Sequence, residues 1–208
     1  IIQRPYSIIA NSNDIPKGIF ISAYATAPLA GDPELILAGK LEAFQAGVAA
    51  LSKLTSGSVH LCVGKESILK NIKDAEVHTI KGPHPAGNVG IQIHKLDPIN
   101  MGERVWTVGP EDVAIIGNLF LTGEFKPERT IALVGTDVKE SDRKYYRTLV
   151  GANVNTLIGT VDTNNTRIIS GDVLTGVKLS NDQFINFYHN TVTLIPEWNE
   201  YAFLGWMP

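Results

Sequence analysis

The sequence predicts an α/β protein in which a parallel, doubly wound sheet is followed by a small, mostly β module. Strand signals and helix signals alternate over the first two-thirds of the chain, and this alternation is typical of parallel strands joined by crossover helices. After about Gly135 the sequence pattern changes, because glycines there separate short segments rich in Val, Ile and Thr. We expect the first unit to change to the second near residues 136–144.

The first predicted strand and helix are marked by prolines and by residue spacing. Residues 18–25 (GIFISAYA) form an apolar run between two prolines, which predicts a buried strand. Asp32, Pro33 and Glu34 then supply an N-cap, a proline at the first helical position and an acid in the first turn. We expect one helix of about five turns from there to residues 55–57. Its buried face is predicted to consist of Leu37, Leu41, Phe44, Val48 and Leu51.

The later elements follow from shorter patterns of the same kind. Pro110 and the two acids after it predict the start of a helix, and Gly123 predicts its end. A strand at 130–134 is expected to close the first unit. The other elements predicted are a strand at 58–63, a short helix at 65–72, a strand at 76–80, a helix that begins near Asn88, a β segment at 145–150 and a short helix at 153–158.

Residues 82–87 (GPHPAG) are the strongest candidate for a binding site. Two prolines flank His84 and restrict its backbone, and two glycines bracket the segment and permit a close approach of another molecule. The segment follows the third predicted strand, and ligands of doubly wound sheets collect beyond the carboxyl ends of the strands. We therefore expect contacts with a ligand or partner here. The residues predicted to make them are Gly82, His84, Pro85, Gly87 and His94.

Motifs for nucleophilic catalysis and for phosphate binding are missing, and no residue is predicted to be catalytic. There is no Gly-x-Ser-x-Gly elbow and no Gly-Lys-Ser/Thr of a Walker A loop. Gly82, Gly87 and Gly90 have the wrong spacing for a dinucleotide fingerprint. Three interpretations of the loop stay open: a cradle for a flavin or nucleotide phosphate near a helix N-terminus, a docking or quinone-contacting loop, and a purely structural loop.

The histidines and the single cysteine do not form a recognisable set of metal ligands. His84 and His94 lie near Asp97 in the sequence, but their spacing is not a recognised ligand pattern, so no metal site is predicted. His60 is expected to be a core or edge histidine of its strand, and His78 to face solvent. Cys62 lies in an apolar run and is expected to be a buried, inert thiol.

Composition excludes several classes of protein. The 208 residues carry a net charge of −3 without a long basic cluster, so nucleic acid is not an expected partner. One cysteine cannot form an internal disulfide or hold an iron–sulfur cluster. No apolar run has the length of a membrane span, and nothing resembles a signal peptide. Because the chain begins at Ile1 without Met, we expect it to be part of something longer.

Short matches in the right order along nearly the whole chain resemble the A subunit of the sodium-translocating NADH:quinone reductase. The most specific is Gly82-Pro-His-Pro-Ala-Gly87 with Gly90 and His94. The family pattern often has a histidine at the position of Gln92, which argues further against a paired-histidine metal site. The other matching segments are 4–7 (RPYS), 19–21, 28–30, 105–107, 112–113, 116–117, 119–120, 122–124, 147–148, 151–152, 169–171, 173–174, 188–189 and 203–206 (FLGW).

This resemblance implies a Rossmann-like α/β domain at 1–140, a β-grasp module of the soluble-ligand-binding type (SLBB-like) at 141–200, and the start of a truncated C-terminal region at 201–208. The implied fold is related to the C subunit of the Rnf complex and to the flavin-binding subunit of respiratory complex I. The resemblance also implies a peripheral subunit on the cytoplasmic face of the bacterial inner membrane. Such a subunit has no redox centre of its own, although the parent complex uses NADH, FMN or FAD, a 2Fe-2S centre and quinone.

The partners implied are the other subunits of the pump, especially a membrane-embedded quinone or flavin subunit. The expected role is therefore assembly, with quinone contact as a further expectation, and the fragment alone is expected to be inactive. Two alternatives remain from the residues themselves: a flavin- or nucleotide-binding oxidoreductase domain, and a module that binds a small soluble ligand.

Overall fold

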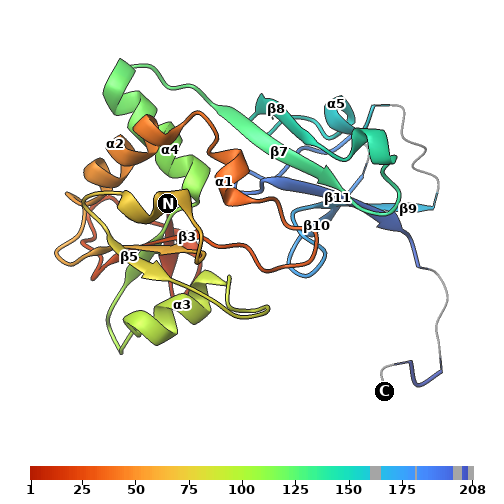
Figure 1. Cartoon of the computed structure of the whole chain (residues 1–208). Helices are drawn as coiled ribbons and strands as arrows, with labels where there is room; N and C mark the ends of the chain where they lie inside the picture. The colour runs from red at the N-terminus through yellow and green to blue at the C-terminus, as the bar shows by residue number, and fades with distance from the viewer. Residues whose placement is uncertain (160–164, 181, 199–202, 206–208) are drawn as a thin grey trace.

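The computed structural model describes residues 1–159, 165–180, 182–198 and 203–205, and it arranges their strands in two sheets (Figure 1). The first sheet and its helices come from the first part of the chain, and the second sheet follows it in sequence and lies beside it. This is the predicted order of a larger α/β unit and a smaller β module.

The first sheet has the strand order β2-β1-β6-β3-β4-β5. Strands β6, β3, β4 and β5 are parallel to one another, whereas β1 pairs antiparallel with both β2 and β6. The chain leaves β3 toward β4 and β5 on one side and returns to β6 on the other. The strands are β1 (Ile2–Arg4), β2 (Ile8–Ile9), β3 (Ile19–Ala23), β4 (Val59–Val63), β5 (Glu76–Thr79) and β6 (Val105–Thr107).

The reversal of strand order between β3 and β6 is a topological switch point. In doubly wound sheets the crevice outside the carboxyl ends of the strands at such a point is the usual place for a ligand. The predicted Rossmann-like arrangement is therefore confirmed, and the strand order itself indicates where its ligand edge lies.

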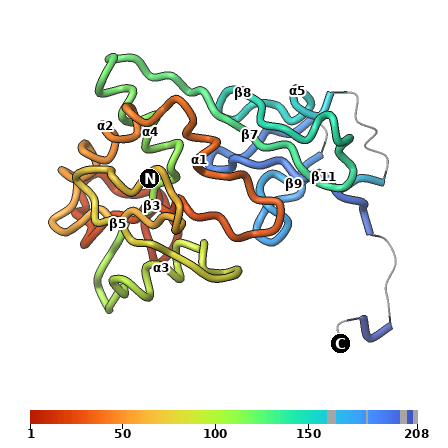
Figure 2. Tube along the Cα trace, viewed as in Figure 1, coloured from red at the N-terminus to blue at the C-terminus, as the bar shows by residue number. Residues whose placement is uncertain are grey.

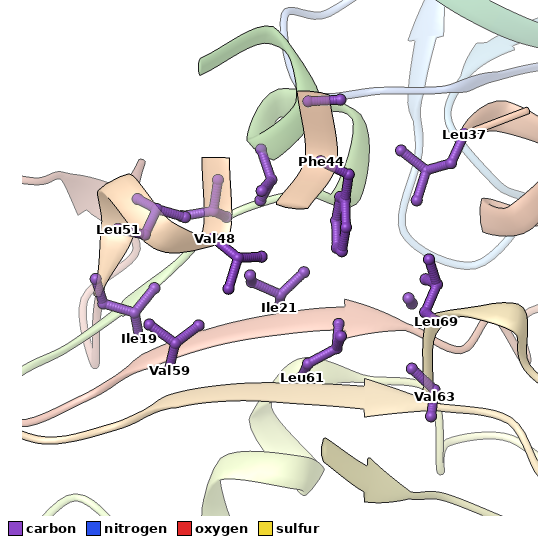
Figure 3. Packing of buried hydrophobic residues seen from close by; sticks show 14 of the residues in the cluster. Ile19, Ile21, Leu37, Phe44, Val48, Leu51, Val59, Leu61, Val63 and Leu69 are labelled. Carbon is purple, nitrogen blue, oxygen red and sulfur yellow. The ribbon is translucent and has the colours of Figure 1, made fainter. Parts of the chain in front are cut away.

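Helices α2 (Leu41–Leu51) and α4 (Pro110–Thr122) cover one face of the first sheet. Figure 3 shows Phe44, Val48 and Leu51 of α2 directed at the apolar side chains of β3 and β4. Ile19 and Ile21 of β3 are fully buried in this cluster. The predicted helix face is confirmed here, except that Leu41 is 41% exposed.

Two glycines allow α2 and α4 to cross in backbone contact. A Cβ atom on Gly117 would lie 1.7 Å from the carbonyl oxygen of Ala43, and one on Gly47 would lie 2.0 Å from the carbonyl oxygen of Val113. Any side chain at either position would force the helices apart, so glycine is required at both.

Helix α3 (Val89–Leu96) lies on the opposite face, where Ile93 packs against Phe20 and Val105. Its start agrees with the prediction of a helix near Asn88. The short helix expected at 65–72 is a single 3₁₀ turn, η1 (Ile68–Asn71), and Ser67 caps it by accepting a hydrogen bond from Leu69 N.

The single helix expected from residue 32 to residues 55–57 is wrong. The segment contains α1 (Pro33–Ile36), a break, and then α2. Gly39 in the break has φ +75°, a left-handed conformation that interrupts the helix. The spacing of the apolar residues predicted one continuous helix because Leu37 and Phe44 are both buried, although they lie on either side of the break.

The second sheet has the strand order β10-β9-β11-β7-β8. Its first and last strands, β7 and β11, lie together at the centre and are parallel, and every other pairing is antiparallel. With the short helix α5 (Asn155–Ile158) between β8 and β9, this is the β-grasp arrangement that we expected. The strands are β7 (Glu128–Val134), β8 (Tyr145–Leu149), β9 (Thr166–Ser170), β10 (Val177–Leu179) and β11 (Thr191–Pro196).

The strand expected at 130–134 exists, but it does not close the first unit. It is β7, which pairs with β8 and β11 in the second sheet. The second sheet thus begins at Glu128. The division of the chain at residues 140 and 200 remains a prediction, and part of the segment 201–208 lies outside the described residues. A single turn, η2 (Glu140–Asp142), occupies the predicted boundary.

Candidate functional site

The loop between β5 and α3, residues 80–88, crosses the carboxyl edge of the first sheet. It starts at the edge strand β5 and reaches the residues that follow β3, two strands away. In Figure 2 this loop and the connection after β3 both run toward the side on which the second sheet lies. The carboxyl edge of β3 is also the edge at the switch point.

Gly87 is the anchor of this loop. Its N–H donates to Thr26 Oγ1 at 2.9 Å, and its carbonyl accepts a hydrogen bond from Ser22 Oγ at 3.0 Å. A Cβ atom at this position would lie 2.4 Å from the carbonyl oxygen of Tyr24. The backbone of the loop can approach the chain after β3 this closely only because residue 87 is a glycine.

The histidine of the loop is held by the same segment. His84 is half-buried, and its Nδ1 lies 3.3 Å from Thr26 Oγ1. Tyr24 donates from its hydroxyl group to the carbonyl oxygen of Gly82 at 3.2 Å, and Gly82 has φ +126°. These contacts fix the loop against the first sheet.

A cleft of about 710 Å³ lies beside the loop, between the first sheet and the second. One wall is formed by the segment after β3, by the end of the loop and by the first turn of α3. The other wall comes from the second module, through Asp172, Thr175 and Tyr188. Its size lies within the range of small-molecule sites. Residues of the first wall include Arg4, Tyr24, Thr26, Gly87, Val89 and Gly90.

A second, smaller cavity of about 190 Å³ lies between the ends of β3 and β6. Ser22, Thr107 and Val108 line it, and it shares Ser22, Val89 and Tyr188 with the larger cleft. The two cavities therefore lie next to each other at the topological switch point.

The first turn of α3 borders the cleft and has backbone N–H groups without a backbone acceptor among the described residues. Ile91 N and Gln92 N donate to the carbonyl oxygen of Asn88, whereas Val89 N and Gly90 N have no backbone acceptor among the described residues. The N-cap residue Asn88 makes no side-chain capping bond. A Cβ atom on Gly90 would have no neighbour within 4 Å. The turn is open to a hydrogen-bond acceptor.

Two residues of opposite charge, Arg4 and Asp172, line the cleft. Arg4 Nε is buried and has no hydrogen-bond partner within the described part of the chain. Burial raises the pKa of Asp172, but hydrogen bonds from Leu174 N, Thr175 Oγ1 and Thr175 N outweigh that effect and lower it. Asp172 is therefore a carboxylate that organises its own loop.

Buried polar contacts join the two units. Glu111, which is 1% exposed, forms an ion pair with Lys40 and accepts hydrogen bonds from Thr130 N at 2.8 Å and from Asn190 Nδ2 at 2.6 Å. Arg129 of β7 is 2% exposed and pairs with Asp112 of α4. These contacts hold the second module against α4, and so they set the position of the second wall.

The structure places the predicted contact residues unevenly. Gly87 lines the cleft, whereas Gly82, His84 and Pro85 support the loop outside the lining, and His94 lies exposed on α3. A role for these residues in contact with a ligand or partner stays a prediction. The sequence reasoning missed Arg4, Asp172 and Tyr188 as lining residues, because nothing in their spacing connects them with the residues after β3.

The other histidines and the cysteine can now be placed. Cys62 is fully buried, and burial raises the pKa of its thiol to about 12, as expected of an inert cysteine. His78 does not simply face solvent, because its Nε2 lies 3.0 Å from Nδ1 of the buried His60. Within the described residues, His84 and His94 do not belong to a cluster of three possible metal ligands.

Comparisons with known proteins agree with both units. A family model described as "NqrA second alpha/beta domain" matches residues 1–125, and one described as "NQRA C-terminal domain", which carries the SLBB label, matches residues 130–181. No helix among the described residues is both long and apolar enough to cross a membrane.

Curated relatives are similar over nearly the whole chain, and each is named as the A subunit of the Na(+)-translocating NADH-quinone reductase. The protein of Marinomonas sp. (strain MWYL1) is 39% identical over 95% of this chain and 44% of its own length. Those of Serratia proteamaculans (36% identical) and Neisseria meningitidis serogroup B (38%) each match 98% of this chain and 46% of their own length. The chain thus spans about half the length of the relatives it matches.

Proposed function

Because the chain belongs to the NqrA family, the A subunit of the Na(+)-translocating NADH-quinone reductase, we propose that it acts as a peripheral part of that oxidoreductase complex. It assembles with the other subunits at the cytoplasmic face of the bacterial inner membrane, and its most important contact is with a membrane-embedded quinone or flavin subunit. NADH, flavins, a 2Fe-2S centre and quinone belong to the whole complex in this proposal.

The chain carries no redox centre of its own in this function. Its one cysteine is buried and its thiol has a pKa of about 12, so it is a poor thiolate ligand and cannot hold an iron–sulfur cluster alone. The loop glycines at 82, 87 and 90 do not have the spacing of a dinucleotide fingerprint. The contribution of the chain is then to bind and position a ligand or partner rather than to transfer electrons.

The cleft between the two units is the proposed site of quinone contact. The observation that carries this is its position at the switch point, with a backbone wall at α3 and an aromatic wall at Tyr188. A quinone head group is a flat ring with two carbonyl acceptors. Its ring would lie against the tyrosines and small apolar side chains of the cleft, and a carbonyl would accept from Val89 N or Gly90 N.

The assembly part of this proposal is tested in membranes. Removal of the subunit should abolish quinone reduction by NADH, and the full-length subunit should be recovered bound to its membrane partner. If it binds no partner and its deletion leaves quinone reduction unchanged, the proposed membership of the working complex is refuted.

The quinone part is tested on the intact complex with a photoreactive quinone analogue. Labelled peptides are expected to contain residues 24–27, 87–91 or 172–175, and Tyr188→Ala should reduce labelling. Tyr6→Ala is the matched control, because Tyr6 is 81% exposed and does not line the cleft. Labelling confined to other subunits, or equal in both variants, would place the quinone elsewhere.

A second candidate function is binding of a flavin or nucleotide through its phosphate group. Arg4 has a buried Nε without a partner among the described residues and lines the same cleft as the open first turn of α3, and this pairing suits an anion. The visible absorption of the purified chain and titration with FMN or NADH test it directly. A colourless chain that binds neither compound would exclude this function.

The third candidate function is a module that binds a small soluble ligand, and a thermal-shift screen distinguishes it from the other two. A compound that binds only the folded chain raises its melting temperature. A screen of flavins, dinucleotides, quinones and common metabolites without any shift would remove this class.

A further inference from the structure

Two histidines and a glutamate gather at the free edge of the first sheet, away from the cleft. His60 is on β4, and Glu76 and His78 are two residues apart on β5, the edge strand. His60 pairs in register with Glu76, and Cys62 pairs with His78. Since alternate residues of a strand point to the same face, all three side chains project from one face of the sheet.

The possible ligand atoms form a compact triangle. His60 Nδ1 lies 3.0 Å from His78 Nε2 and 3.7 Å from Glu76 Oε2, and His78 Nε2 lies 4.0 Å from the same carboxylate oxygen. Within the plane of these three atoms, the point equidistant from them is about 2.1 Å from each, which is the length of zinc–imidazole and zinc–carboxylate bonds.

The surroundings hold this donor set in place. The His60 ring stacks on Phe20 with 4.4 Å between ring centroids, and Ser58 Oγ donates to the other carboxylate oxygen of Glu76. The side chain of His60 is 10% exposed, that of His78 25% and that of Glu76 58%. The buried ligand is therefore fixed, and the open side leaves room for a water molecule as a fourth ligand.

The protonation state also suits a metal. Burial lowers the pKa of His60, which favours the neutral imidazole, the form that binds a metal ion. The hydrogen bond between the two imidazoles requires one ring proton, and a cation bound between them would replace that proton.

We propose that His60, Glu76 and His78 form a binding site for a divalent transition-metal ion, with Zn²⁺ as the best-suited occupant. Two imidazoles and one carboxylate are a donor set of zinc sites that retain an open position. The alternative is that a proton, and not a metal ion, is shared between the side chains. The cluster would then be a hydrogen-bonded support for the edge strand.

The test is titration of the chelator-treated chain with Zn²⁺ by calorimetry, together with the visible spectrum of the Co²⁺-loaded chain. We expect one ion per chain and a Co²⁺ spectrum typical of nitrogen and oxygen ligands. His78→Gln and Glu76→Gln should each weaken Zn²⁺ binding about tenfold or more. Both side chains are partly exposed, so these variants are expected to fold, which circular dichroism without metal verifies.

His94→Gln is the matched control, because His94 is an exposed histidine on α3 outside the cluster. It should bind Zn²⁺ like the parent chain. Zn²⁺ should also raise the melting temperature of the parent and control chains but not that of His78→Gln. Absence of saturable binding, or equal affinity of the parent and His78→Gln chains, would overturn the proposal and leave the hydrogen-bonded support as the explanation.

Discussion

The close approach at Gly87 predicts a large effect of one added methyl group. In Gly87→Ala, the new Cβ would lie 2.4 Å from Tyr24 O, 2.7 Å from Thr26 Oγ1 and 2.8 Å from Thr26 N. Two of these three atoms belong to the backbone, so the contact cannot be relieved by rotating a side chain. The loop must move away from the segment after β3 instead.

The size of the effect follows from what that movement breaks. Displacing the loop strains a packed region, which costs about 1–3 kcal/mol. It also lengthens the hydrogen bonds from Gly87 N to Thr26 and from Ser22 to Gly87 O, each of which contributes about 1 kcal/mol. We expect the free energy of unfolding to fall by about 3–5 kcal/mol in total.

The matched control is Gly90→Ala, three residues further along. A Cβ there has no neighbour within 4 Å, and the residue is in the first turn of α3. Alanine should therefore leave the stability unchanged or raise it by about 0.5–1 kcal/mol. Both variants are measured by urea denaturation followed by circular dichroism. Equal midpoints for the two variants would refute the steric argument for Gly87.

Three further predictions concern buried ionisable groups. Glu111→Ala should lower the free energy of unfolding by about 3 kcal/mol, because Lys40 and Thr130 N lose their acceptor. Thermal denaturation measures this loss of stability. A loss as small as that of the exposed control Glu66→Ala would contradict the prediction. Cys62 should not react with a thiol reagent in the folded chain at about pH 8 and should react fully in urea, since burial raises its pKa; rapid labelling of the folded chain would show that the strand opens easily. Burial lowers the pKa of His189 from its ordinary 6.5, so the unfolded chain takes up the proton first and the free energy of unfolding declines as the pH falls through 6.5. The urea midpoint should therefore drop on acidification, and His189→Gln should lessen this drop. An unchanged drop in His189→Gln would show that other groups cause it.

The first sheet could be predicted to the extent that its strands are long apolar runs. Strands β3 and β4 follow from such runs and from the helix signal between them, whereas β5 has the mixed sequence EVHT. Strand β6 has three residues and β2 has two, which is too short for any periodicity. Trp106 on β6 donates to Gln3 on β1, and only the folded chain brings these residues together.

The assignment of β7 failed for a related reason. The segment 130–134 has the composition of a strand in either sheet, and its place is decided by its partners β8 and β11, of which β11 is about sixty residues later in the chain. The polar contacts of Glu111 and Asp112 have the same origin. The acids after Pro110 are sufficient to predict a helix start, but their partners Arg129 and Asn190 belong to another unit.

The candidate site could be predicted only where its residues are close together both in the sequence and in the folded chain. Gly87 lies in a segment whose glycines and prolines already indicate a rigid loop, and it is a lining residue. Asp172 and Tyr188 reach the cleft only through the packing of the second module, which no local pattern describes. The same holds for His60 and His78, which are eighteen residues apart and adjacent only through strand register.

The two walls of the cleft belong to different units, and this has a thermodynamic consequence. The contacts of Glu111 and Arg129 determine the angle at which the second wall meets the first. A ligand that touches both walls binds best at that angle, so its binding free energy and the stability of the joint between the units are linked. Whatever loosens the joint weakens the binding of the ligand, and by reciprocity an occupied cleft holds the two units together.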